Sequence, residues 1–181
     1  MTSQTKGTVL ITGASSGIGA IYAERFAARG HALILAARNR DRLAALADKL
    51  TTRHGVKVRT IVADLTDRAG LAEVEAVLKT DASISHLVNN AGFGSAAPLA
   101  SASVDEMERM VAINVTAPLR LTYAAVPQFV ARKQGTIINI ASIVAIGPEV
   151  LNGVYGGTKS FVLAFSQSLR KELAGTGVHV Q

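Results

Sequence analysis

Two side chains four residues apart, Tyr155 and Lys159, could together move a proton. Residues i and i+4 share one face of a helix, so an ammonium group would lie beside the phenol if this segment is helical. A phenol with a pKa near ~10 exchanges protons poorly at neutral pH, and a nearby positive charge favours its phenolate form. Tyr155 is therefore a candidate general acid and base. The alternative is that this common spacing marks only core or surface side chains.

A hydroxyl group precedes this pair. Ser142 lies 13 residues before Tyr155 and directly follows the apolar run Thr136–Ala141. If that run is a buried parallel strand, Ser142 lies at the carboxyl edge of the sheet, where ligands bind in such folds. The alternative for Ser142 is a turn residue.

A glycine-rich turn, Thr12–Gly19, follows the apolar run Thr8–Ile11 and precedes a run typical of a helix. Glycines allow a tight turn and close approach of a ligand, and a helix N-terminus offers free N–H groups to a pyrophosphate. In this context of strand, turn and helix we expect a dinucleotide-binding site, and the alternative is an ordinary Gly/Ser loop.

The residues after the next apolar run indicate whether the cofactor carries a 2′-phosphate on its ribose. Sites for NAD place a carboxylate there to accept from the ribose 2′-hydroxyl. Here the segment 36–40 reads Ala-Ala-Arg-Asn-Arg, so cations replace the carboxylate. Arg38 would pair with a 2′-phosphate, which predicts NADP(H), with NAD(H) as the alternative cofactor. In the other interpretation Arg38 and Arg40 only begin a helix, with Asp41 as their ion-pair partner.

These residues lie between apolar runs that lack clean alternation, as buried parallel strands do. We expect strands at Thr8–Ile11, Ala32–Ala37, Val56–Val62, His86–Asn89, Thr136–Ala141 and Val178–Val180. Helices are expected at Ile18–Arg29, Asp41–Leu50, Arg68–Lys79, from a capping box at Ser103–Glu106 toward Arg132, and at Tyr155–Ala174. Pro118 and Pro127 should kink or segment the fourth of these helices. The alternation predicts an α/β fold, a doubly wound parallel sheet of the Rossmann type in one domain spanning residues 1–181.

Composition narrows the class of partner. The 181 residues are 49% hydrophobic and 18% charged, with a net charge of +6 that suits an anionic ligand. We expect no nucleic-acid partner, because no dense basic run occurs and aromatic residues make up 4%. Cysteine is absent and the four histidines match no metal spacing, so no metal site is expected. No run reaches ~18 apolar residues and Met1–Lys6 is polar, so we expect a cytoplasmic protein without a membrane partner.

Four separated motifs, in order, resemble those of the short-chain dehydrogenase/reductase family. They are the Gly-x-x-x-Gly-x-Gly turn at 13–19, Asn-Asn-Ala-Gly at 89–92, Ser142, and Tyr-x-x-x-Lys at 155–159. The resemblance extends from about Thr8 to the last residue and implies the strand order 3-2-1-4-5-6. It implies cofactor contacts from Gly13, Ser15, Ser16, Gly17, Ile18, Gly19, Arg38, Asp64, Leu65, Asn90, Ala91, Gly92, Tyr155 and Lys159.

The resemblance also implies a division of labour in hydride transfer between the nicotinamide and a small carbonyl or alcohol substrate. Tyr155 would exchange the proton, Ser142 would hydrogen-bond the substrate oxygen, and Lys159 would bind the nicotinamide ribose and assist Tyr155. Asn114 matches the family's fourth member, which holds a water that relays protons. The helices that carry Asn114 and Tyr155 form a dimer interface in the family, so a homodimer or higher homo-oligomer is expected.

The sequence departs from the family at its end. Family members continue past the position of Gln181 with a Pro-Gly segment, a substrate lid, another helix and a seventh strand. We therefore expect a longer natural chain, and an incomplete domain that holds the catalytic residues without the whole working site. The alternative function is a non-catalytic nucleotide-binding or regulatory module on the same fold.

Overall fold

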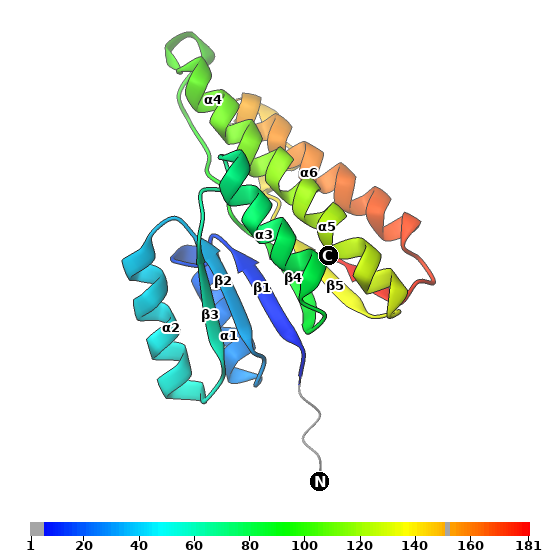
Figure 1. The fold of residues 1–181 in the computed structure, drawn as a ribbon. Helices are drawn as coiled ribbons and strands as arrows, with labels where there is room; N and C mark the ends of the chain where they lie inside the picture. Colours follow the sequence, from blue (N-terminus) through cyan, green and yellow to red (C-terminus); the bar gives the residue numbers. More distant parts are fainter. Residues whose placement is uncertain (1–5, 151–152) are drawn as a thin grey trace.

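A six-stranded parallel sheet forms the centre of the computed structural model, which describes residues 6–150 and 153–181 (Figure 1). Its strands run in the order β3-β2-β1-β4-β5-β6, which confirms the expected topology. Their bounds are β1 Thr8–Thr12, β2 Leu33–Ala37, β3 Val58–Val62, β4 Ile84–Asn89, β5 Gly135–Asn139 and β6 Val178–Val180. The chain order reverses between β1 and β4, so the loops after these two strands part and leave a crevice at the carboxyl edge.

Helices connect successive strands. They are α1 Gly17–Ala28, α2 Arg40–His54, α3 Arg68–Thr80, α4 Val104–Val111, α5 Ala117–Ala131 and α6 Gly153–Glu172. Short 3₁₀ turns lie at η1 Leu99–Ser101, η3 Ile143–Ala145 and η4 Pro148–Val150. A π-helical segment, η2 Ala112–Thr116, joins α4 to α5.

The two faces of the sheet are covered by different helices, and the core is divided accordingly. Alternate strand residues such as Val9 and Leu10 point to opposite faces and enter two separate buried clusters. On one face α1 and α2 contribute residues such as Phe26 and Leu43. On the other, α3 and α5 lie side by side (Figure 1) and contribute residues such as Leu121 and Phe129. Burial on both faces explains why the inner strands read as continuous apolar runs, whereas the edge strand β3 keeps exposed residues such as Arg59 and Thr60.

Side-chain caps fix where several helices begin. Asn39 accepts from the Arg42 amide at 2.9 Å, and Asp67 accepts from the Gly70 amide at 3.1 Å. Ser103 accepts from the Glu106 amide at 3.5 Å, which is one half of the predicted capping box. These caps place the first turns of α2 and α3 beside the carboxyl edge of the sheet.

The prediction for the two prolines was only partly right. The long helix toward Arg132 is segmented, but the irregular part is the π-helical turn before Pro118. Pro118 lies in the first turn of α5, where a missing amide hydrogen costs little. Pro127 lies inside α5, which continues to Ala131, so it does not divide the helix.

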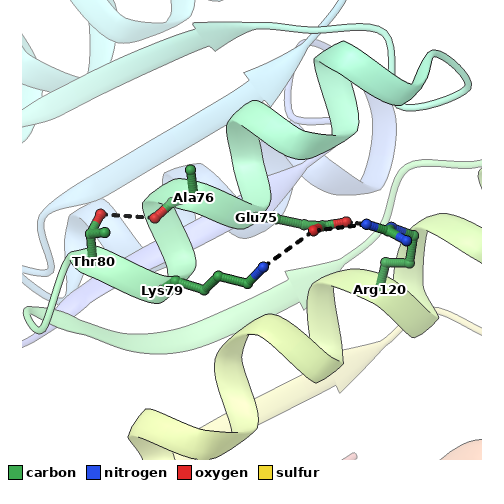
Figure 2. Close-up of polar contacts among 5 residues, drawn as sticks. All are labelled: Glu75, Ala76, Lys79, Thr80 and Arg120. Atoms are coloured by element: carbon green, nitrogen blue, oxygen red, sulfur yellow. Dashed lines mark hydrogen bonds and ion pairs between the residues drawn. The ribbon is translucent and has the colours of Figure 1, made fainter.

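A buried charge ties the helices of one face together. The carboxylate of Glu75 on α3 accepts two hydrogen bonds from the guanidinium of Arg120 on α5, and the Lys79 ammonium lies 3.5 Å from it (Figure 2). The Glu75 side chain is 9% exposed, so these cations compensate a charge that has left water. The α3–α5 contact is therefore specified by charge as well as by apolar packing.

No helix among the described residues is long and apolar enough to cross a membrane. Within the same residues, the search for three or more His, Asp or Glu side chains grouped as metal ligands finds none.

Candidate functional site

A cleft of about 510 Å³ opens at the carboxyl edge of β1, β2, β3 and β4, the place expected for a ligand in this topology. Eight of the predicted cofactor residues line it: Gly13, Ser15, Ser16, Arg38, Asp64, Leu65, Ala91 and Gly92. The cleft thus brings together segments from the ends of four strands.

The glycine turn is shaped by close backbone packing at one position and by open space at another. Gly13 has φ of +63°, and a Cβ on Gly19 would come within 2.4 Å of the Gly13 carbonyl oxygen. Gly17 also has a positive φ, of +55°, but no described atom lies within 4 Å of a Cβ built there. Gly13 and Gly19 are therefore required by packing within the turn, whereas Gly17 is favoured by its positive φ and leaves room for a ligand.

The N-terminus of α1 is available to an anion. Its first intrahelical bond runs from the Ala20 amide to the Ser16 carbonyl at 3.3 Å, so the amides of Gly17, Ile18 and Gly19 precede that bond. The Ser16 side chain accepts no capping hydrogen bond from the described residues, and the first turn of α1 contains no acidic residue. These free donors and the helix dipole together favour a phosphate group.

Asn90 and Thr12 hold the glycine turn against the loop after β4. The Asn90 side-chain amide donates to the carbonyls of Thr12 at 2.9 Å and of Gly13 at 3.2 Å. The Thr12 hydroxyl accepts from the amides of Asn90 and Ala91, each at 3.0 Å. The Asn90 side chain is thus used for support, and its neighbours Ala91 and Gly92 face the cleft.

Arg38 and Asp64 pair across the rim of the cleft. The guanidinium Nη1 lies 3.9 Å from a carboxylate oxygen of Asp64, whereas the interpretation of Arg38 as a partner of Asp41 finds no such contact among the described residues. Partial burial opposes ionisation of Asp64, but hydrogen bonds from Thr66 and the charges of Arg38 and Arg109 outweigh it and hold the pKa of this carboxyl below its usual value.

A second arginine, which the sequence analysis did not identify, also lines the cleft. Arg42, in the first turn of α2, lies in the lining with Arg38 and the N-cap residue Asn39. Arg40, which the sequence analysis grouped with Arg38, is not among the described residues that line the cleft. No local pattern indicated Arg42, because Arg38 lies before the first residue of α2, Arg40, and helical spacing does not relate the two arginines.

Tyr155 and Lys159 lie on one face of α6, as their spacing predicted. The Lys159 ammonium is 6.0 Å from the centre of the Tyr155 ring and donates to the Ile140 carbonyl at 2.8 Å. Lys159 is 8% exposed, and this burial lowers the pKa of its ammonium group. The pair therefore places a buried cation beneath a half-buried phenol, which is an arrangement suited to proton exchange.

Asn114 lies in the π-helical segment and is almost fully buried, at 2% exposure. Its side-chain nitrogen donates to the Phe93 carbonyl at 2.9 Å and to the Thr158 hydroxyl at 3.0 Å, and its oxygen accepts from the Phe93 amide at 3.2 Å. π-Helical turns in long helices are frequent at functional sites. Here the turn allows one side chain to join the loop after β4 to the helix that carries Tyr155.

Ser142 caps the 3₁₀ turn η3 in the loop after β5, where its side chain accepts from the Val144 amide at 3.4 Å. The same loop is attached to α6, because the Ser160 hydroxyl donates to the Ala145 carbonyl at 2.9 Å. Ser142 and Tyr155 are thus carried by two elements that contact each other directly.

Gly94 is a further residue of the site without a sequence signal. A Cβ on Gly94 would lie 3.0 to 3.1 Å from three atoms of the Tyr155 ring. The loop after β4 can approach the phenol this closely only because the residue is glycine. The contact joins residues 61 positions apart, so no local pattern could reveal it.

The comparisons with known proteins agree with this geometry. A family model described as short chain dehydrogenase matches residues 7–181. The NADP-dependent 3-hydroxy acid dehydrogenase YdfG of Salmonella typhi is 41% identical over 174 residues, which cover 95% of this chain and 68% of the relative.

Two solved structures share the fold closely. The short-chain dehydrogenase from Sphingobium yanoikuyae in complex with NADPH has a TM-score of 0.95 and 50% identity, covering 97% of this chain and 68% of that one. The bulky-bulky ketone specific alcohol dehydrogenase from Comamonas testosteroni has a TM-score of 0.95 and 47% identity, covering 97% and 70% of the two chains. The family model matches nearly the whole chain, the chain spans about two thirds of the length of these relatives, and the fold is shared. This chain therefore belongs to the short-chain dehydrogenase family of oxidoreductases.

Proposed function

We propose that this chain is the cofactor-binding and catalytic part of an NADP(H)-dependent oxidoreductase that interconverts a carbonyl compound and its alcohol. The observation that carries the proposal is that the cleft adjoins the pair formed by Lys159 and Tyr155. The cleft with two arginines and free helix amides lies beside Gly92, and a Cβ on Gly92 would lie 3.8 Å from the Lys159 ammonium. A dinucleotide bound with its adenosine in the cleft therefore has its other end directed toward Lys159 and Tyr155.

The residues of the cleft fit NADP(H) better than NAD(H). Arg38 and Arg42 both line the cleft, where the 2′-phosphate of NADP(H) would find two cations. The amides of Gly17, Ile18 and Gly19 suit the pyrophosphate. The relative from Salmonella is NADP-dependent and the Sphingobium structure contains NADPH, which supports the same choice.

The catalytic residues then divide the reaction among them. When bound, the cofactor gives or takes the hydride at the substrate carbon. Tyr155 gives a proton to the substrate oxygen during reduction and takes one during oxidation, and the Ser142 hydroxyl donates a hydrogen bond to the same oxygen. Lys159, held by the Ile140 carbonyl, keeps positive charge near the phenol and would hold the nicotinamide ribose. Asn114 fixes the loop after β4 through Phe93, and the relay through a water remains a prediction.

Replacing Tyr155 with Phe tests the proposal. General acid and base catalysis contributes about 10²- to 10⁴-fold, so NADPH-dependent carbonyl reduction should fall by at least about 100-fold with NADPH affinity unchanged. Tyr22→Phe is the matched control, because Tyr22 lies on α1, which covers the other face of the sheet. If Tyr155→Phe keeps more than about a tenth of the rate, Tyr155 is not the acid. If wild-type protein binds NADPH but reduces no carbonyl compound, the alternative of a non-catalytic nucleotide-binding module is favoured.

We also propose that the protein forms homodimers through α5 and α6. Tyr123 on α5 is 72% exposed, and Phe161 stacks on Phe165 along α6 with 5.6 Å between ring centres. Phe161 and Phe165 are half-buried, and large aromatic side chains that stay open to solvent on helices favour an interface. Sedimentation equilibrium should give the mass of a dimer, and Tyr123→Glu should shift it toward the monomer. A monomeric wild-type protein would contradict this proposal without affecting the one on catalysis.

A further inference from the structure

Two loops at the carboxyl edge approach the helix that carries Tyr155. The loop after β4 reaches the phenol at Gly94. The loop after β5 carries Ser142, and its η4 turn packs so closely that a Cβ on Gly156 would lie 2.8 Å from Pro148. A substrate whose oxygen contacts both Ser142 and Tyr155 must therefore lie against side chains of these two loops.

The loop after β5 carries two large apolar side chains that are exposed to solvent. Ile143, which directly follows Ser142, is 77% exposed, and Ile146 one turn later is 73% exposed. Ile137 and Ile138, on the strand that precedes this loop, are by contrast buried. Covering an exposed isoleucine with an apolar group removes apolar surface from water, so these two side chains favour an apolar ligand.

Neither loop offers a partner to an anionic substrate. The segments 90–102 and 140–150 contain no Lys, Arg or His, and their one charged residue is Glu149. Of the cations near the site, Lys159 is buried against Ile140, whereas Arg38 and Arg42 lie at the adenosine end of the cleft, where the charge of Arg109 also acts on Asp64. A substrate carboxylate at Ser142 would lie beside the apolar side chain of Ile143, in a loop whose one charged residue, Glu149, is negative.

We propose that the substrate is an uncharged ketone or aldehyde with apolar groups on its carbonyl carbon, and that Ile143 is a specificity-determining residue. This rests on the proposed function and adds the substrate class. The carbonyl carbon gains a hydride from NADPH, the oxygen gains a proton from Tyr155, and the products are a neutral alcohol and NADP⁺. The resulting phenolate takes a proton from solvent.

Two compounds that differ mainly in charge test the proposal, namely methyl 3-oxo-3-phenylpropanoate and the 3-oxo-3-phenylpropanoate anion. We expect kcat/KM for NADPH-dependent reduction of the ester to exceed that of the anion by at least about 100-fold, because an unpaired carboxylate among apolar groups loses its hydration. Equal values, or a higher value for the anion, would overturn the proposal.

A charge introduced at Ile143 tests the assignment to this residue. Ile143→Arg should lower kcat/KM for the ester at least about 10-fold and raise that for the anion, with NADPH affinity unchanged. Ile21→Arg is the matched control, since Ile21 is 56% exposed on α1, which covers the opposite face of the sheet. An equal effect of both variants, or no effect of Ile143→Arg, would overturn the assignment.

Binding separates this inference from the proposed function. If neither compound is reduced, ligand-observed NMR with NADP⁺-loaded protein decides the matter. Ester binding that exceeds anion binding and is lost in Ile143→Arg supports an apolar substrate site at Ile143, although the catalytic proposal then fails. Absence of ester binding to protein that binds NADP⁺ overturns the inference.

Discussion

The Arg38 guanidinium lies 3.9 Å from the Asp64 carboxylate, so two residues expected to contact the cofactor form an ion pair at the rim of the cleft. Their side chains are 66% and 37% exposed, and an ion pair this open to water is weak. A phosphate can therefore replace the carboxylate as the partner of Arg38 at little cost.

Three arginine variants test how the cleft recognises a 2′-phosphate. Arg38→Asp should weaken NADPH binding by about 10- to 100-fold and leave NADH binding nearly unchanged, since charge-assisted hydrogen bonds contribute about 1.5–3 kcal/mol. Arg42→Gln should have the same direction with a smaller effect. Arg40→Gln is the control, because Arg40 is exposed and is not among the described residues lining the cleft.

Dissociation constants measured from NADPH and NADH fluorescence check this prediction. An unchanged ratio of the two constants in Arg38→Asp would refute the assignment of the 2′-phosphate site. If Arg40→Gln matched Arg42→Gln, the effect would be one of overall charge and not of a contact in the cleft.

The arginine segment also shows how far the sequence could predict the site. A missing carboxylate after β2 was sufficient to identify Arg38, because that position follows from the strand alone. The place of Arg42 depends on where α2 begins. The Asn39 cap fixes this point, and whether that hydrogen bond forms is known only from the structure. The contact of Gly94 with Tyr155 and the π-helical turn around Asn114 likewise depend on packing between distant segments. Strand order was predictable because the motifs identified the family.

A histidine pair at the other end of the sheet should make stability depend on pH. Burial, and then the charge of His31, lower the pKa of His86 from 6.5 to about 4. Between these values the unfolded chain binds a proton that the folded chain does not, so stability decreases as pH falls from about 6.5 to about 4. The change is at most about 3 kcal/mol.

Urea unfolding of wild type and His86→Gln at pH 7.5, 5.5 and 4.5 measures this effect. The difference in free energy of unfolding between the two proteins should shrink toward acid pH. His179→Gln is the control, because His179 is exposed on β6. A wild-type curve parallel to that of His86→Gln would show that His86 is not the group responsible.

The α3–α5 ion pair of Figure 2 should be asymmetric in its response to mutation. Arg120→Ala removes both hydrogen bonds to the buried Glu75 carboxylate, whereas Lys79→Ala removes a single exposed contact at 3.5 Å. Because an unpaired buried charge costs more than a missing surface pair, Arg120→Ala should lower the free energy of unfolding more than Lys79→Ala. The double variant Glu75→Leu/Arg120→Ala should recover part of that loss. Chemical denaturation measures all four proteins, and equal losses for the two single variants would contradict a buried charge.

The contact between Gly94 and Tyr155 leads to a prediction about catalysis without any change of a functional group. In Gly94→Ala the new methyl group would lie 3.0 Å from the phenol ring, so either the loop or Tyr155 must move. A small displacement of a catalytic group can cost up to about 100-fold, and we expect kcat to fall about 10-fold or more. NADPH affinity should stay the same, because Gly94 is not among the described residues lining the cleft.

Gly157→Ala is the matched control for this variant. Gly157 lies on α6 two residues after Tyr155, and no described atom lies within 4 Å of a Cβ built there. Alanine stabilises a helix interior by about 0.5–1 kcal/mol relative to glycine, so this variant should unfold at higher urea concentration with kcat unchanged. If Gly94→Ala and Gly157→Ala have the same kcat, the loop after β4 adjusts freely. The close approach at Gly94 would then have no part in positioning Tyr155.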